Sequence, residues 1–326
     1  MRAVVVSEYG GPEQLTVIES GIPIISDDQV LIRVEATSVN YADIKARKGA
    51  YHLGNKPPFI PGIDAAGVVE AVGAKVTHVK IGQRVIAFPA TGSYAEYAAI
   101  SGSLVYPLPD EIDFLTGAAI PIVSFTAYKL LVDVACIQPR ETVLIHAAAG
   151  GVGTMAVQLA KLLGAGCVIG TVGSAHKTQT VLNAGADCVI NSSKDNFADI
   201  VNELTDGKGV DIVLDGVGGA ITEQSLGCLA KFGRLVSFGD ASGSSGPISA
   251  RDLIASCRSV IGFSLGTIRR EKPQLLAHTA DRVIELVRKG QLTTVIGRTF
   301  ALEEASAAHS WIESRQSIGK ALLKVR

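Results

Sequence analysis

Two glycines three residues apart, Gly150 and Gly153, stand in a stretch that suits the binding of a nucleotide. Gly150 has no Cβ, so a pyrophosphate could approach its backbone, and Gly153 would let a helix pack closely on the preceding strand. The free N–H groups and the dipole of a helix N-terminus favour an anion there. Ala148 replaces the first glycine of the usual fingerprint, and small residues also occur in tight turns that bind nothing. The motif A-x-G-x-x-G therefore predicts a phosphate site.

The residues on either side of this turn change character in the order strand, turn, helix. Residues 142–146 are a short β-branched and apolar run, as expected of a parallel strand that is buried on both faces. Across residues 152–163 apolar side chains recur at spacings of three and four, which predicts a helix lying on that sheet. A membrane span over residues 142–160 is rejected, because the central glycines and His146 suit a turn better.

Length and composition favour an enzyme that acts on a small molecule. The 326 residues, 47% of them apolar, are enough for two domains with substantial cores. The formal net charge is −1, and no basic run or basic amphipathic stretch indicates a nucleic acid or a membrane surface as a partner. The apolar part of residues 1–13 is too short and too soon charged for a signal peptide. A cytoplasmic location is therefore expected.

Cysteine and histidine usage predicts neither disulfides nor a metal site. The five cysteines are far apart and form no C-x-x-C pair, which is typical of reduced, mostly buried thiols. The six histidines show no H-E-x-x-H or other metal spacing. A metal is therefore not expected.

The first third of the chain reads as short strands broken by turn residues. Across residues 1–118 these strands predict a β-rich unit, with one clear helix at residues 41–48. A second helical segment is predicted at residues 113–132 despite Pro121. It would lead into the next domain.

From residue 142 to about residue 264, six apolar strands alternate with segments long enough for helices. This pattern predicts a doubly wound parallel sheet. Ligands bind at the carboxyl edge of such a sheet, where the strand ends at Thr171, Asp215, Phe238 and Phe263 should gather. A long helix at residues 272–289, a strand, a helix and a last strand at residues 320–325 should return to the first domain.

Nine motifs together give a more specific indication of the family. They are YGGPEQL, VNYADIKARKGAY, PGIDAAGVVEAVG, GQRVIAF, GSYAEY, HAAAGGVGTMAVQLAK, GTVGSAHK, VSFGDASG and GKALL. With them the chain resembles the medium-chain dehydrogenase/reductase superfamily, and most closely its zinc-independent NADPH:quinone oxidoreductase branch. The resemblance implies an α/β fold in which a Rossmann doubly wound parallel sheet, residues 119–267, is inserted into a GroES-like β-rich catalytic domain, residues 1–118 and 268–326. It also implies a homodimer.

The zinc alcohol dehydrogenases of the same superfamily carry ligands that this chain lacks. They place a cysteine where this sequence has Asn40, and a histidine-glutamate pair where it has Ile63 and Asp64. Without a Lewis acid, ordinary alcohol oxidation loses several kcal/mol of stabilisation. The expected acceptor is therefore electrophilic in itself, a quinone or a conjugated enone, and the expected reductant is NADPH.

The resemblance implies that Asn40, Tyr41 and Tyr51 line the substrate cleft beside the nicotinamide. Asn40 can offer an amide donor to the acceptor oxygen, and Tyr51 can offer a phenol. The alternatives are that Asn40 only caps the helix that begins at Tyr41 and that Tyr51 only packs. Asp43 is expected to be structural, as an acid in a first helical turn. Lys45 stands where the branch usually has an aromatic residue, which leaves substrate preference open.

The coenzyme should be NADPH rather than NADH, because the segment after the second strand has no carboxylate to repel a 2′-phosphate. Ser174 and Lys177 would hold that phosphate, unless Lys177 is only a surface lysine. Ser192 stands where the branch that the chain resembles often carries a tyrosine that contacts the phosphate, and this difference would reduce selectivity for NADPH. Phe238 could instead belong to the core. Together with the glycine turn, the resemblance implies these coenzyme contacts: Pro121, Thr126, Ala148, Gly150, Gly151, Val152, Gly153, Thr171, Gly173, Ser174, Lys177, Ser192, Phe238, Gly239, Phe263 and Leu265.

The sequence thus predicts hydride transfer from NADPH to a quinone or conjugated enone, without a metal and without a covalent intermediate. One alternative is a 2-alkenal or enoyl reductase. Another is a protein that binds NADPH without turning it over.

Overall fold

The computed structural model describes residues 1–52, 54–244 and 246–326. Its contacts divide the chain into two compact units, Met1–Phe125 with Leu265–Arg326, and Thr126–Ser264. The domain boundaries predicted after residues 118 and 267 differ from these by a few residues, since helix α3 (Pro121–Lys129) spans the first change of unit. No helix in the described part of the chain combines the length and the apolarity needed to cross a membrane.

The second unit is built on one parallel sheet whose strands run in the order β10-β9-β8-β11-β12-β13. Numbered along the chain, this is the 3-2-1-4-5-6 order of a doubly wound fold, so the predicted fold class is confirmed. The order reverses between β8 and β11, where such folds bind their ligands. The strands are β8 (Thr142–Ile145), β9 (Cys167–Val172), β10 (Cys188–Asn191), β11 (Val210–Asp215), β12 (Leu229–Ser237) and β13 (Ser259–Gly262).

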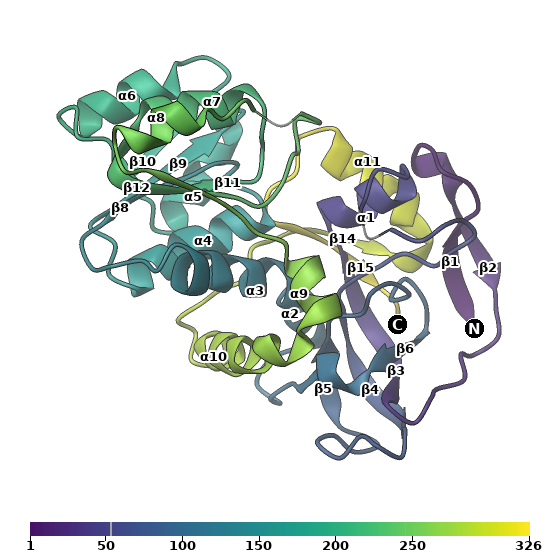
Figure 1. The fold of residues 1–326 in the computed structure, drawn as a ribbon. Helices are drawn as coiled ribbons and strands as arrows, with labels where there is room; N and C mark the ends of the chain where they lie inside the picture. Colours follow the sequence, from purple (N-terminus) through teal and green to yellow (C-terminus); the bar gives the residue numbers. More distant parts are fainter. Residues whose placement is uncertain (53, 245) are drawn as a thin grey trace. The chain divides into compact units, whose positions relative to one another are not determined.

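Helices cover both faces of this sheet, as Figure 1 shows for α4 on one side and α6 and α7 on the other. Strand side chains such as Leu144, Ile169 and Val213 are fully buried beneath them, which explains why the strands read as continuous apolar runs. The helices are α4 (Gly151–Leu162), α5 (Thr178–Asn183), α6 (Phe197–Leu204), α7 (Ala220–Gly227) and α8 (Ala250–Ile254).

The first unit contains a two-stranded ribbon and a larger, mainly antiparallel sheet. The ribbon pairs β1 (Arg2–Val6) with β2 (Leu15–Glu19). The larger sheet has the order β14-β15-β3-β4-β5-β7, with β6 also paired to β3. Its strands are β3 (Gln29–Val39), β4 (Ala65–Val72), β5 (Arg84–Ala87), β6 (Tyr97–Ser101), β7 (Val105–Pro107), β14 (Ile296–Ala301) and β15 (Lys320–Lys324). Strand β15 lies between β14 and β3, so residues 36–39 and 321–324, from near the two ends of the chain, pair within one sheet.

Three helical predictions need correction. The segment predicted at residues 113–132 is two helices, α2 (Phe114–Ala118) and α3, because proline has no N–H and can only begin the second helix. The sixth strand, whose end was expected at Phe263, ends at Gly262, and a helix that was not expected, α9 (Leu265–Glu271), follows it. The helix expected from residue 272 begins with a 3₁₀ turn, so that α10 is Ala277–Arg288. The remaining helices of this unit are α1 (Tyr41–Arg47) and α11 (Ala305–Glu313).

Candidate functional site

The turn between β8 and α4 is shaped by its two glycines in different ways. A Cβ on Gly153 would stand 2.5 Å from the Cα of Ala148 and 2.6 Å from the carbonyl oxygen of Ala147, so only glycine fits there. A Cβ on Gly150 would meet only the Ala147 oxygen, at 3.3 Å. Gly150 is the N-cap of α4, whose first N–H groups have no partner within the helix. The turn thus leaves space at a helix N-terminus, and it fits a pyrophosphate.

Backbone hydrogen bonds bring the predicted strand ends to one edge of the sheet. The Ala148 N–H donates to the Thr171 carbonyl, and the Phe238 N–H to the Asp215 carbonyl, both at 2.9 Å. The Phe263 N–H donates to the carbonyl of Ser237 at the same distance. The half-buried ring of Phe238 lies over Gly216, where a Cβ would come within 2.8 Å of the ring. These residues gather as expected, while their contacts with a coenzyme stay predictions.

The residues predicted to select NADPH lie close to the end of β9. A Cβ on Gly173 would meet nothing within 4 Å, so the backbone there is open to a ligand. The exposed hydroxyl of Ser174 bonds to the Nδ1 of His176 at 2.8 Å. Lys177 is half-buried, and this burial lowers its pKa. Ser192 reaches the same place from β10, since its N–H and its hydroxyl both donate to the Val172 carbonyl.

Beside this edge, His146 forms a buried network that sequence reasoning did not find. Its Nδ1 is 2.9 Å from the hydroxyl of Thr171, and its Nε2 is 2.8 Å from the hydroxyl of Ser225. The Ser225 hydroxyl donates its hydrogen to the Ile221 carbonyl, so it accepts from the His146 Nε2–H, and Nδ1 accepts from Thr171. Burial lowers the pKa of His146 to about 4, although the Asp215 carboxylate opposes the shift. The imidazole is therefore neutral near pH 7.

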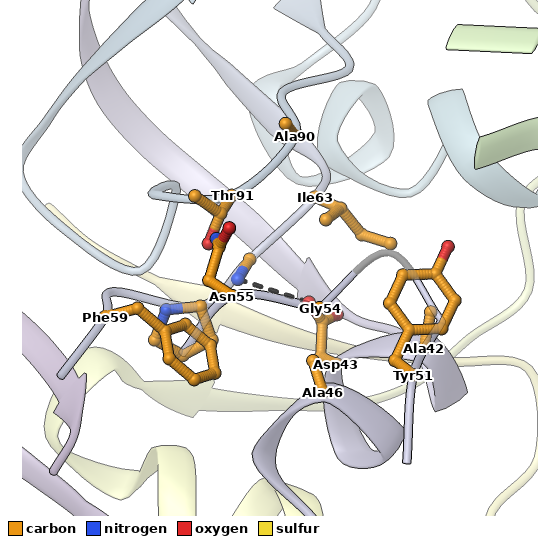
Figure 2. A pocket seen from close by; sticks show the side chains of 12 residues that line it. Ala42, Asp43, Ala46, Tyr51, Gly54, Asn55, Phe59, Ile63, Ala90 and Thr91 are labelled. Atoms are coloured by element: carbon orange, nitrogen blue, oxygen red, sulfur yellow. Dashed lines mark hydrogen bonds between the residues drawn. The ribbon is translucent and has the colours of Figure 1, made fainter. Parts of the chain in front are cut away.

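A small cavity lies within the first unit, and side chains of helix α1 such as Ala42 and Ala46 line it (Figure 2). It is narrow, with room for about one water molecule, and it is partly open to solvent. The N–H of Gly62 donates to the Oδ1 of Asp43 on its wall, at 3.1 Å. Its lining is Ala42, Asp43, Ala46, Tyr51, Gly54, Asn55, Phe59, Pro61, Gly62, Ile63, Ala90 and Thr91.

Of the three predicted substrate residues, only Tyr51 lines this cavity. Burial raises the pKa of its phenol, and the Arg269 guanidinium opposes the shift. Arg269 is itself buried, donates to the Pro89 carbonyl and lies 4.7 Å from the centre of the Phe88 ring. Sequence reasoning missed Arg269, since α9 was not expected. Tyr41 is 46% exposed and is not part of the described lining.

Asn40 lies just before the helix that forms one wall of the cavity, and its side chain is 6% exposed. Its backbone N–H donates to the Oδ2 of Asp43 at 2.9 Å, so Asp43 helps to cap α1. Burial raises the pKa of Asp43 to about 7 against the hydrogen bond from this N–H. The amide side chain also contacts two charged groups: its Oδ1 accepts from the Lys320 ammonium at 2.6 Å, and its Nδ2 donates to the Oδ2 of Asp64 at 2.8 Å.

Asp64 and Lys320 complete a buried polar cluster around Asn40. The Lys320 Nζ is 3.4 Å from the Asp64 Oδ2 and 3.3 Å from the Val39 carbonyl. The Asp64 carboxylate also accepts from the Ser38 hydroxyl at 2.5 Å and from the Ile122 N–H at 2.9 Å. The Lys320 ammonium therefore contacts oxygens of both Asn40 and Asp64. These two residues stand at positions where the zinc alcohol dehydrogenases carry metal ligands. These residues do not fit a catalytic zinc, and no group of three or more possible metal ligands occurs within the described ranges.

Three other predicted coenzyme residues lie on helices near the unit boundaries. Pro121 is the first residue of α3, and Thr126 is buried on the same helix. Leu265 is the first residue of α9 and is also buried. Their contacts with a nicotinamide remain predictions.

Comparisons with known proteins give two family models and many full-length relatives. Residues 26–110 match the alcohol dehydrogenase GroES-like domain, and residues 151–281 match the zinc-binding dehydrogenase model. Human quinone oxidoreductase is 38% identical over 99% of this chain and 97% of its own length, and the Salmonella typhimurium quinone oxidoreductase is 37% identical over 97% of each. The crystal structure of Escherichia coli quinone oxidoreductase complexed with NADPH is 34% identical, covers 100% of both chains and superposes with a TM-score of 0.94. The chain therefore belongs to the quinone oxidoreductase branch of the medium-chain dehydrogenase/reductase superfamily.

Proposed function

We propose that this protein is an NADPH-dependent reductase of quinones that works without a metal. The observation that carries the proposal is the full-length similarity to quinone oxidoreductases, one of them solved with NADPH. The open space at Gly150 and the N-terminus of α4 supports it, because a diphosphate fits there. When bound, NADPH supplies the hydride that the quinone accepts.

The chain's own residues orient the acceptor and stabilise charge on its oxygen. The Asn40 amide nitrogen carries two hydrogens, of which one is donated to Asp64, and we propose that the other is donated to the acceptor oxygen. The Tyr51 phenol on the cavity wall is a second donor, and its raised pKa keeps it protonated. Water delivers the proton to the product, so no buried acid is required.

The direct test is the loss of NADPH absorbance with benzoquinone under anaerobic conditions. Asn40→Ala should raise the activation free energy of turnover by roughly 2 to 4 kcal/mol at most, because the transition state loses one positioned hydrogen-bond donor. Asn183→Ala, which removes an exposed amide on α5, is the matched control and should keep wild-type turnover. Tight NADPH binding with no oxidation by any quinone would instead favour a protein that only binds the coenzyme. A panel with 2-alkenals and conjugated enones separates the remaining reductase alternatives.

We further propose that the preferred coenzyme is NADPH, held by Ser174 and Lys177 at the end of β9. The support is their position beside an open Gly173, in a segment without a carboxylate. Comparing kcat/KM for NADPH and NADH tests the claim, and a preference for NADH would overturn it.

We also propose a homodimer and a cytoplasmic location. Strand β13 ends the sheet of the second unit, and large apolar side chains are exposed nearby, Ile254 at 75% and Phe232 at 70%. An open strand edge with apolar neighbours supports pairing with a second copy. All five cysteines are free, which suits a reducing compartment. Light scattering after gel filtration tests the dimer, and a monomeric mass at micromolar concentration would refute it.

A further inference from the structure

The Asn40 amide is held at both ends by charged groups. Its oxygen accepts from the Lys320 ammonium and its nitrogen donates to the Asp64 carboxylate. An amide oxygen only accepts hydrogen bonds and an amide nitrogen only donates them. Turning the amide over would set its NH₂ group against the ammonium and its oxygen against the carboxylate, which is repulsive on both sides. The cluster therefore stabilises a single orientation of this side chain.

The distances around Lys320 indicate that its ammonium interacts more closely with Asn40 than with Asp64. Its shortest contact, 2.6 Å, goes to the neutral amide of Asn40, whereas its counter-ion Asp64 is 3.4 Å away. Asp64 has closer donors of its own in the Ser38 hydroxyl and the Ile122 N–H. Lys320 is 3% exposed, so little solvent competes for these bonds. Its tightest interaction is thus with the amide, rather than with the carboxylate that neutralises it.

We propose that Lys320 is a positioning residue that keeps Asn40 a hydrogen-bond donor toward the substrate. The inference rests on the proposed reduction of quinones, in which Asn40 donates to the acceptor oxygen. Negative charge grows on that oxygen during hydride transfer, so an N–H stabilises it and an amide oxygen would repel it. By holding the amide oxygen, Lys320 leaves only the nitrogen to face the substrate.

The test compares Lys320→Met, which keeps the length of the side chain and removes its charge, with Lys324→Met. Lys324 is the exposed last residue of the same strand, so its variant should behave as wild type. Lys320→Met should lower kcat by a factor no larger than that of Asn40→Ala, while the Kd for NADPH changes less than twofold. In an Asn40→Ala background, Lys320→Met should lower kcat further by less than twofold, because it acts through the amide.

A second variant keeps the test informative if Lys320→Met does not fold, since that change leaves a buried carboxylate without its cation. Lys320→Met combined with Asp64→Asn is neutral and similar in size, and circular dichroism and the unfolding midpoint check its fold. We expect it to lose kcat to the same extent, because nothing then opposes turning of the Asn40 amide.

Two results would overturn the inference. In one, Lys320→Met and the neutral double variant both keep wild-type kcat. In the other, the losses from Lys320→Met and Asn40→Ala multiply, which would mean that Lys320 acts independently of the amide. Unchanged quinone turnover in Asn40→Ala itself would overturn the donor role of Asn40, and with it this inference. No reduction of quinones by the wild-type protein would refute the proposed function.

Discussion

The second unit should lose stability in mild acid because His146 is buried without charge. Its pKa is lowered to about 4, mainly by burial, whereas an unfolded histidine titrates near 6.5. The unfolded chain therefore binds more protons than the folded one between these values. The neutral histidine therefore contributes fully to the free energy of unfolding above about pH 6.5, and this contribution is lost as the pH falls toward about 4.

The size of the effect follows from the two pKa values. One pKa unit corresponds to about 1.4 kcal/mol, so the free energy of unfolding should be about 2 kcal/mol lower at pH 5 than at pH 7. The fall should continue to about 3 kcal/mol near pH 4. His309 in the first unit adds a comparable effect, since burial lowers its pKa to about 3 and the Arg47 guanidinium lowers it too.

The assay is chemical denaturation at pH 7 and pH 5 of the wild-type protein and His146→Gln. The glutamine amide can still donate toward Ser225 and accept from Thr171, but it cannot titrate. The variant should therefore lose about 2 kcal/mol less than the wild type between the two pH values. An NMR titration that places the pKa of folded His146 near 6.5 would refute the reasoning, as would equal losses in both proteins.

Three further predictions concern coenzyme and substrate. Gly150→Val should abolish NADPH binding in a fluorescence titration, because its side chain would occupy the space of the pyrophosphate. The unfolding midpoint should stay near wild type, because a Cβ at this position would meet only one protein atom within 4 Å. Retained binding would contradict the proposed phosphate site. Tyr51→Phe should lower turnover less than Asn40→Ala does, and complete loss of turnover with NADPH still bound would make the phenol an obligatory proton donor. Lys177→Met should raise KM for NADPH by roughly ten- to a hundredfold and leave KM for NADH unchanged, since a hydrogen bond to a charged group contributes about 1.5 to 3 kcal/mol; equal changes for both coenzymes would show that Lys177 does not contact the 2′-phosphate.

Local patterns in the sequence predicted most of the fold. The six parallel strands and the turn before α4 were found because apolar runs and small residues identify them over a few neighbouring positions. The single helix predicted across Pro121 was wrong, because helical periodicity outweighed the missing N–H of proline in the prediction. Helix α9 was missed because its first residues continue an apolar strand pattern.

The candidate site could be predicted only where its parts are close in sequence. Asn40 was identified by its resemblance to family positions, and the prediction left open whether it only caps a helix. The structure places its side chain between Asp64 and Lys320, the latter 280 residues away along the chain. No spacing or periodicity could show this contact, since it depends on the pairing of β15 with β3. His146 was missed for a similar reason, because Ser225 is 79 residues away.

The place of β15 between β14 and β3 also affects the order in which the protein can be assembled on the ribosome. Residues 29–33 of β3 can pair early with β6, whereas residues 36–39 must wait for residues 321–324 of β15 before this part of the edge is paired. All strands of the second unit emerge during that interval, so its parallel sheet can close first. Until then residues 36–39 of β3 expose unpaired backbone N–H and C=O groups to other nascent chains, a hazard that chaperones limit. Pulse proteolysis of ribosome-bound chains should accordingly find residues 126–264 protected before residues 36–39 of β3, and the opposite order would contradict this sequence of events.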